Sequence, residues 1–159
     1  MVWPHVLSAS RVGLASAALR HVEDARSLLS CSPVQTYYLA GYGPECARKA
    51  ALTSASESEA DALDRAVGHG FRGDAETAFA LACTLDPLAT RYTLRHWRAR
   101  LPVLARWSES CRYEKSDHLG GKQARAMLDT ASGLVEEVIA ALWADGRLPP
   151  LSDLVQVKP

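Results

Sequence analysis

A helix that begins near Pro33 is the sequence feature that most constrains how this chain folds. Its start carries a serine that can cap the helix, a proline suited to the first helical position and a glutamine that can complete a capping box, at Ser32, Pro33 and Gln35. Apolar and aromatic residues then recur every three or four positions, at Tyr38, Leu39, Tyr42 and Cys46. We therefore predict an amphipathic helix that continues to Lys49 and packs its aromatic face in the core.

Two glycines and a proline interrupt this helical pattern, at Gly41, Gly43 and Pro44. A proline inside a helix removes the hydrogen bond to the carbonyl four residues earlier, which costs about 3 kcal/mol. Glycines allow another helix to approach closely, because they have no side chain. We expect either a kink or close helix packing at this point.

Two further long helices are expected, one on each side of this segment. The first runs from Ser10 to Cys31, and the short turn at Cys31 and Ser32 favours an antiparallel hairpin with the Pro33 helix. The last helix, Lys122 to Ala144, has the clearest apolar periodicity in the chain and ends before Gly146. Its apolar stripe is wide enough to serve both a core and a homodimer contact.

The chain of 159 residues fits one domain. Shorter helices are expected at residues 56–67, 75–85 and 87–100, and a polar loop at 108–121. The predicted fold is all-α: an up-down bundle of roughly four to six helices, with a long antiparallel N-terminal hairpin and a long last helix. Residues 1–8 form an N-terminal arm, residues 9–146 the domain and residues 147–159 a mobile C-terminal tail.

Charge is balanced over the whole chain but not along it. Lys+Arg and Asp+Glu both number 18, so any attraction to nucleic acid must come from local clustering. Residues 53–76 are acidic, which is typical of a solvated face and compatible with an acidic lid. The segment 87–107 has arginines and no acidic residue.

Three of these arginines share one helical face and alternate with aromatic residues. They are Arg91, Arg95 and Arg98, interleaved with Tyr92, Trp97 and Trp107. Arginine can bind phosphates and aromatic rings can stack on bases, so this segment is a candidate RNA-binding surface. The alternative is that the aromatic residues belong to the core and the arginines pair with the acidic stretch.

The sequence contains no pattern typical of a metal site, a cofactor site or a membrane-spanning segment. The four cysteines stand far apart, without a CxxC pair or histidines at metal-finger spacing, so we expect them to be reduced and mostly buried. No cofactor motif is present. The N-terminus lacks the features of a signal peptide, and no apolar run is long enough to cross a bilayer. These features predict a cytoplasmic protein without a resident metal.

Two segments resemble a known family. The pattern HVEDARSLL at residues 21–29, followed by YYLAGYGPECARKA at 37–50, resembles the first two helices of the HEPN family of small, all-helical prokaryotic domains. Arg112 and Tyr113, before the last long helix, extend the resemblance over residues 9–145. The family includes ribonucleases and catalytically silent members, among them partners of nucleotidyltransferases and components of toxin-antitoxin and phage-defence systems.

The resemblance implies a catalytic pair, Arg112 and His118. In such ribonucleases four to six residues separate an arginine from a histidine, and two such motifs meet across a homodimer cleft. The histidine can take the proton of an RNA 2′-hydroxyl while the arginine holds the phosphate, so no metal is needed. Glu45 is the candidate to orient Arg112. RNA contacts are expected from Arg91, Arg95, Arg98, Tyr113 and Lys115.

Other interpretations of these residues stay open. Arg91 and His96 also fit the spacing, and about one such pair is expected by chance in a chain of this composition. Tyr113 stands where the ribonucleases usually carry a small polar residue. Glu45 can instead pair with Arg48 or Lys49. The prediction is a metal-independent endoribonuclease of toxin-antitoxin or phage-defence systems.

The alternative function is a non-catalytic module that binds RNA or partners a nucleotidyltransferase, an antitoxin or another defence component. It needs no catalytic pair. His21, beside the apolar stripe of the first helix, fits a half-buried structural histidine better than a functional one.

Overall fold

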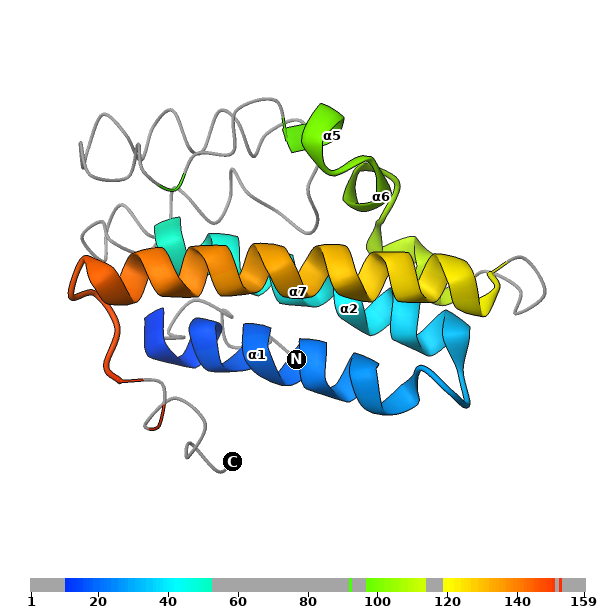
Figure 1. Ribbon diagram of the computed structural model, residues 1–159, viewed down its shortest axis with the longest axis horizontal. Helices are drawn as coiled ribbons and strands as arrows, with labels where there is room; N and C mark the ends of the chain where they lie inside the picture. Colours follow the sequence, from blue (N-terminus) through cyan, green and yellow to red (C-terminus); the bar gives the residue numbers. More distant parts are fainter. Residues whose placement is uncertain (1–10, 53–91, 93–96, 114–118, 151, 153–159) are drawn as a thin grey trace, which may run out of the picture.

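The computed structural model describes residues 11–52, 92, 97–113, 119–150 and 152 (Figure 1). Its elements are α1 (Arg11–Leu28), α2 (Pro33–Leu52), α5 (Trp97–Arg100), α6 (Pro102–Ala105), the 3₁₀ helix η3 (Glu109–Tyr113) and α7 (Gly121–Ala144). Every described element is helical, which confirms the all-α class for this part of the chain. The helices predicted at 56–67 and 75–85, and most of the one at 87–100, lie outside the described residues.

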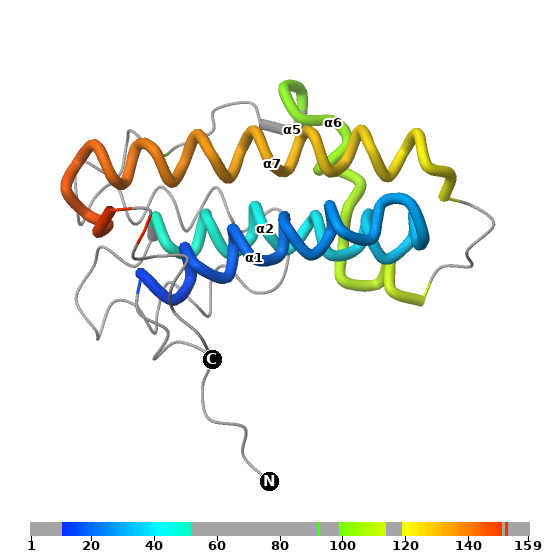
Figure 2. Tube along the Cα trace, turned by 60° about the horizontal axis from the view of Figure 1, so that its bottom comes forward, coloured from blue at the N-terminus to red at the C-terminus, as the bar shows by residue number. Residues whose placement is uncertain are grey.

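Three long helices lie side by side and form the body of the protein. α1 and α2 run antiparallel as the predicted hairpin, and α7 packs against both while running in the same direction as α2 (Figures 1 and 2). α1 ends at Leu28, three residues before the predicted end. Its last carbonyl, that of Leu28, accepts hydrogen bonds from the N–H groups of Cys31 and Ser32 at 3.0 and 2.8 Å, so the reversal takes four residues.

α2 packs its small residues, not its predicted aromatic stripe, into the core. Its fully buried alanines follow helical spacing, at Ala40, Ala47, Ala50 and Ala51. Tyr38 and Tyr42, which the periodicity placed in the core, are only partly buried, whereas Tyr37 is buried. The helix face was therefore misassigned, because alanine and glycine contribute little to an apolar pattern even where they mark the closest packing.

Close helix packing explains the glycines of α2. A Cβ on Gly43 would lie 2.8 Å from a methyl group of Val22 on α1 and 3.3 Å from one of Val135 on α7. α2 stays a single helix through Pro44, which is itself fully buried. The sequence predicted either a kink or close helix packing at this point, and the contacts of the described residues show close helix packing.

α7 confirms the prediction of a long, strongly amphipathic last helix. Its buried residues include the whole predicted stripe: Ala124, Met127, Leu128, Ala131, Leu134, Val135, Val138, Ile139 and Leu142. Gly146 ends the helix with φ 69°, and the N–H groups of Gly146 and Arg147 bond to the carbonyls of Trp143 and Leu142. Leu148 is 6% exposed, so the first residues of the predicted mobile tail pack against the core.

The first residues of the predicted polar loop form the 3₁₀ helix η3. Cys111 in η3 is buried, and η3 follows Trp107, which is 1% exposed. Trp107 Nε1 donates a hydrogen bond to the carbonyl of Tyr38 at 3.1 Å. Tyr92 is also buried, so the two aromatic residues of the arginine-rich segment whose side chains are described belong to the core.

The prediction that the cysteines are reduced and mostly buried is confirmed only in part. Cys31, Cys46 and Cys111 are free thiols, as expected. Cys31 is exposed, because it lies in the turn between α1 and α2, and Cys46 is partly buried. In the part of the chain that the structure describes, no helix is long and apolar enough to cross a membrane.

The contact between Gly41 and Trp107 gives a stability prediction. A Cβ at Gly41 would overlap the indole ring, so Gly41→Ala should lower the free energy of unfolding by about 1–3 kcal/mol, the range for an overpacked core. Urea denaturation measures this change. Gly133→Ala on α7 is the matched control: its Cβ would meet nothing within 4 Å, so it should stabilise by about 0.5–1 kcal/mol. An equal gain at Gly41 would contradict the packing described here.

Candidate functional site

Four ring-bearing residues from α1, α2 and the segment before η3 form an aromatic cluster: His21, Tyr38, Tyr42 and Trp107. The hydroxyls of Tyr38 and Tyr42 are hydrogen-bonded at 2.9 Å, and their rings meet edge to face at 5.1 Å. Tyr42 also meets Trp107 edge to face at 5.0 Å, and the His21 ring lies tilted against it at 5.5 Å. Edge-to-face contacts of this kind fix ring orientation beyond what area burial alone provides.

Arg112 lies at the edge of this cluster. Its guanidinium is exposed and lies 4.6 Å from the ring centre of Tyr113. Hydrogen bonding to the side chain of Tyr38, and then the nearby Tyr113, raise the pKa of Arg112. The site therefore presents a permanent positive charge, held between two tyrosines and open to solvent.

Glu45 lies near Tyr42 and is mostly buried, as is its partner Lys49. The Lys49 Nζ to Glu45 Oε1 distance is 2.8 Å, and the two side chains are 11% and 5% exposed. Burial, and then the hydrogen bond to Tyr38, raise the pKa of Tyr42; the Glu45 carboxylate adds to this rise and Arg112 opposes it. Glu45 and Arg112 thus both lie near the same tyrosine, and Lys49 is a partner of Glu45, as the alternative interpretation held, although the pair is buried.

His21 carries a buried ring nitrogen without a hydrogen-bond partner in the described structure. Its Nδ1 is covered, and the imidazole leans against Tyr42. Burial and the positive charge of Arg20 lower the pKa of His21, while Asp24 and Glu45 oppose this effect. The imidazole is therefore neutral at physiological pH. It is half-buried, as predicted, but its Nδ1 is not satisfied by a neighbour.

Other reactive chemistry is absent from this face in the residues that can be described. Burial, and then the nearby Glu45, raise the pKa of Cys46 to about 11, so its thiol stays protonated and is a poor nucleophile. No group of three or more His, Cys, Asp or Glu side chains that could hold a metal ion occurs within residues 11–52, 97–113 and 119–150. The chemistry that this face offers is a fixed cation, hydroxyl groups and a neutral imidazole.

Only part of the predicted site can be located. Arg112, Tyr113 and Glu45 are described, and Tyr113 is 75% exposed. Arg98 belongs to α5 by its backbone, while Arg91, Arg95, Lys115 and His118 lie outside the described residues. The structure thus places one member of the Arg112 and His118 pair.

The polar role of Tyr38 and Tyr42 was not predicted. Helical spacing placed both rings in the core, yet their hydroxyls bond to each other, and the Tyr38 side chain raises the pKa of Arg112. A tyrosine pair four residues apart on a helix does carry a usable signal, since phenolic hydroxyls need partners when partly buried. Two phenylalanines would have suited a purely apolar face.

These elements define an all-α protein with an exposed arginine at the edge of an aromatic cluster. No family model, no curated protein and no solved structure matches the chain.

The lowered pKa of His21 predicts a pH dependence of stability. Between the folded pKa and the unfolded value of 6.5, the unfolded chain binds more protons, so the free energy of unfolding should fall as pH drops below 6.5. Urea denaturation at about pH 7.5 and about pH 5.5 should show a larger loss for the natural protein than for His21→Gln. An NMR titration midpoint of His21 above 6.5 would contradict this account.

The buried pair of Glu45 and Lys49 gives a second stability prediction. Lys49→Met removes the cation that lies 2.8 Å from the buried Glu45 carboxylate, so the free energy of unfolding should fall by about 3 kcal/mol. The double variant with Glu45→Gln should recover part of this loss, because it also removes the buried charge that lost this partner. Strictly additive losses in denaturation experiments would show that the two side chains are not coupled.

Proposed function

We propose that this protein is a HEPN-like, metal-independent endoribonuclease. The observation that supports it is the position of Arg112, whose exposed guanidinium lies beside Tyr113 and near the side chain of Tyr38. A fixed arginine next to an exposed aromatic ring suits a backbone phosphate and its adjacent base. The resemblance at residues 21–29, 37–50 and 112–113 assigns this arginine the phosphate-binding role.

The proposed reaction is an attack by the RNA 2′-oxygen on the neighbouring phosphorus. His118 takes the 2′-hydroxyl proton, a bond forms between this oxygen and phosphorus, and the bond to the 5′-oxygen breaks. The departing oxygen takes a proton from solvent, which leaves a 2′,3′-cyclic phosphate and a 5′-hydroxyl. Arg112 stabilises the charge that develops on the phosphate oxygens. Glu45 acts at a distance, through the tyrosines that position Arg112.

The proposal extends to the fold and assembly. The complete domain is an up-down bundle of roughly four to six helices, and two copies form a cytoplasmic homodimer in which the two Arg112 and His118 pairs face one cleft. A role in toxin-antitoxin or phage defence follows from the family resemblance.

Cleavage of a labelled single-stranded RNA in the presence of a chelator tests this function. Arg112→Ala and His118→Ala should each reduce the cleavage rate by about 100-fold or more, the usual effect of removing one charge-stabilising donor or base. Arg125→Ala is the control, because Arg125 is an exposed arginine of α7 that has no role in the proposed mechanism. Unchanged cleavage by either site variant, or cleavage that requires Mg²⁺, would contradict the mechanism.

A second candidate function is a non-catalytic module that binds RNA or a partner such as a nucleotidyltransferase or an antitoxin. The 75% exposure of Tyr113 favours it, since the ribonucleases usually place a small polar residue after the arginine. Stacking on such a ring is worth about 1–3 kcal/mol per base.

The second candidate predicts RNA binding without cleavage. Tyr113→Ala should then weaken RNA binding by about tenfold in a fluorescence anisotropy titration, while Trp143→Ala, at the opposite end of α7 and 55% exposed, should not. Equal affinity of the Tyr113 variant and the natural protein would exclude base stacking at this position.

A further inference from the structure

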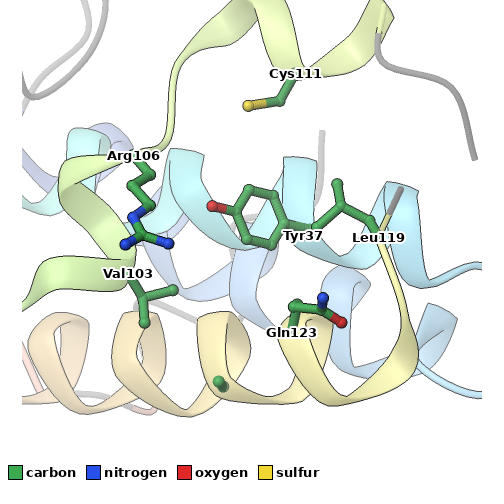
Figure 3. A pocket seen from close by; sticks show the side chains of 7 residues that line it. Tyr37, Val103, Arg106, Cys111, Leu119 and Gln123 are labelled. Carbon is green, nitrogen blue, oxygen red and sulfur yellow. The ribbon is translucent and has the colours of Figure 1, made fainter. Parts of the chain in front are cut away.

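A cavity of about 320 Å³ lies between α2, α6, η3 and the start of α7 (Figure 3). It is lined by Tyr37, Val103, Arg106, Cys111, Leu119, Gln123 and Ala126. Its volume falls at the lower end of the range for small-molecule sites, about 300–1,000 Å³. A ligand the size of a nucleoside monophosphate or a small aromatic acid matches this space.

The polar groups of the cavity are mostly hydrogen-bond donors. Arg106 is the one charged residue of the lining, and within the described residues its guanidinium has no acidic partner. The hydroxyl of Tyr37 points toward it (Figure 3). Gln123 Oε1 already accepts the N–H of Gly120 at 3.0 Å, so the amide N–H₂ is the part of this side chain that remains available to a ligand.

The polar groups that line the cavity favour a negatively charged ligand. A guanidinium presents donors in a planar fork that matches a carboxylate or phosphate, and none of the described residues that line the cavity is acidic and would repel an anion. The remaining wall is apolar, from Val103, Leu119 and Ala126. An anionic group at Arg106 and an uncharged body against these side chains would therefore satisfy both parts of the cavity.

We propose that this cavity is a binding site for a small organic anion, a phosphate ester or carboxylate with a planar body, whose anionic group Arg106 binds. The site is separate from the aromatic cluster. Cys111 lines the cavity while its neighbour Arg112 reaches Tyr38, and Tyr37 lines the cavity while Tyr38 belongs to the cluster. A ligand in the cavity contacts η3 directly, so its binding is coupled to the position of Arg112.

Isothermal titration calorimetry on the full chain tests the proposal. Adenosine 5′-monophosphate and benzoate are the two anionic probes, and adenosine and benzamide are their uncharged counterparts. At least one anion should bind, and bind at least tenfold more tightly than its uncharged counterpart. The two arms distinguish a phosphate ester from a carboxylate ligand. Failure of both anions to bind at millimolar concentration would overturn the proposal.

Two variants locate the site. Arg106→Gln should weaken binding of the anion by at least tenfold, because it removes the charge but keeps a side chain of similar length. Ala126→Trp should block the cavity without disturbing the core, since Ala126 is exposed on α7. Arg125→Gln, next to it and outside the lining, is the control and should bind normally. Unchanged affinity in Arg106→Gln and Ala126→Trp would place the ligand elsewhere and overturn the assignment. These titrations need no RNA, so their outcome is independent of the cleavage experiment.

Discussion

The packing of Trp107 against Gly41 is the contact on which the position of the candidate site depends. The indole fills the space that a side chain on Gly41 would occupy, and its Nε1 bonds to the carbonyl of Tyr38 on the same helix. This bond and this contact fix the segment between α6 and η3 against α2. Because Trp107 also packs on Tyr42, the contact that anchors the segment is part of the aromatic cluster that Arg112 borders. The packing of Trp107 in the core therefore also determines the geometry of the candidate site.

The fold was most predictable from the sequence where residues within one helix indicate both its ends and its buried face. α7 has large aliphatic residues at helical spacing and a glycine with positive φ at its end, and both signals are local. The start of α2 at Pro33 and the antiparallel hairpin were likewise predictable, since a proline at the first helical position and a short connection leave few alternatives.

The predictions that were wrong concern residues whose burial or contacts depend on other helices, which the periodicity of one helix does not indicate. Tyr38 and Tyr42 have the spacing of a core face, but Ala40, Gly43 and Ala47 take that position because α1 and α7 approach closely. A small residue leaves space for a neighbouring helix, whereas a tyrosine fills it, so the packing distance decides which face is buried. Glu45 forms an ion pair with Lys49, one turn away on the same helix, and the sequence spacing indicates this pair. Glu45 and Arg112 also act in opposite directions on the pKa of Tyr42, and this effect between different elements cannot be found from spacing.

The five residues of η3 show how a short element can serve several surfaces at once. A 3₁₀ helix has three residues per turn, so three consecutive side chains point about 120° apart. Cys111 is buried and lines the cavity, Arg112 reaches the tyrosines, and Tyr113 is 75% exposed to solvent. An α-helix would spread the same residues over about 200°, which would leave part of its circumference unused. The 3₁₀ geometry thus lets one turn touch the core cavity, the aromatic cluster and solvent. A shift of η3 that alters one of these contacts must alter the others.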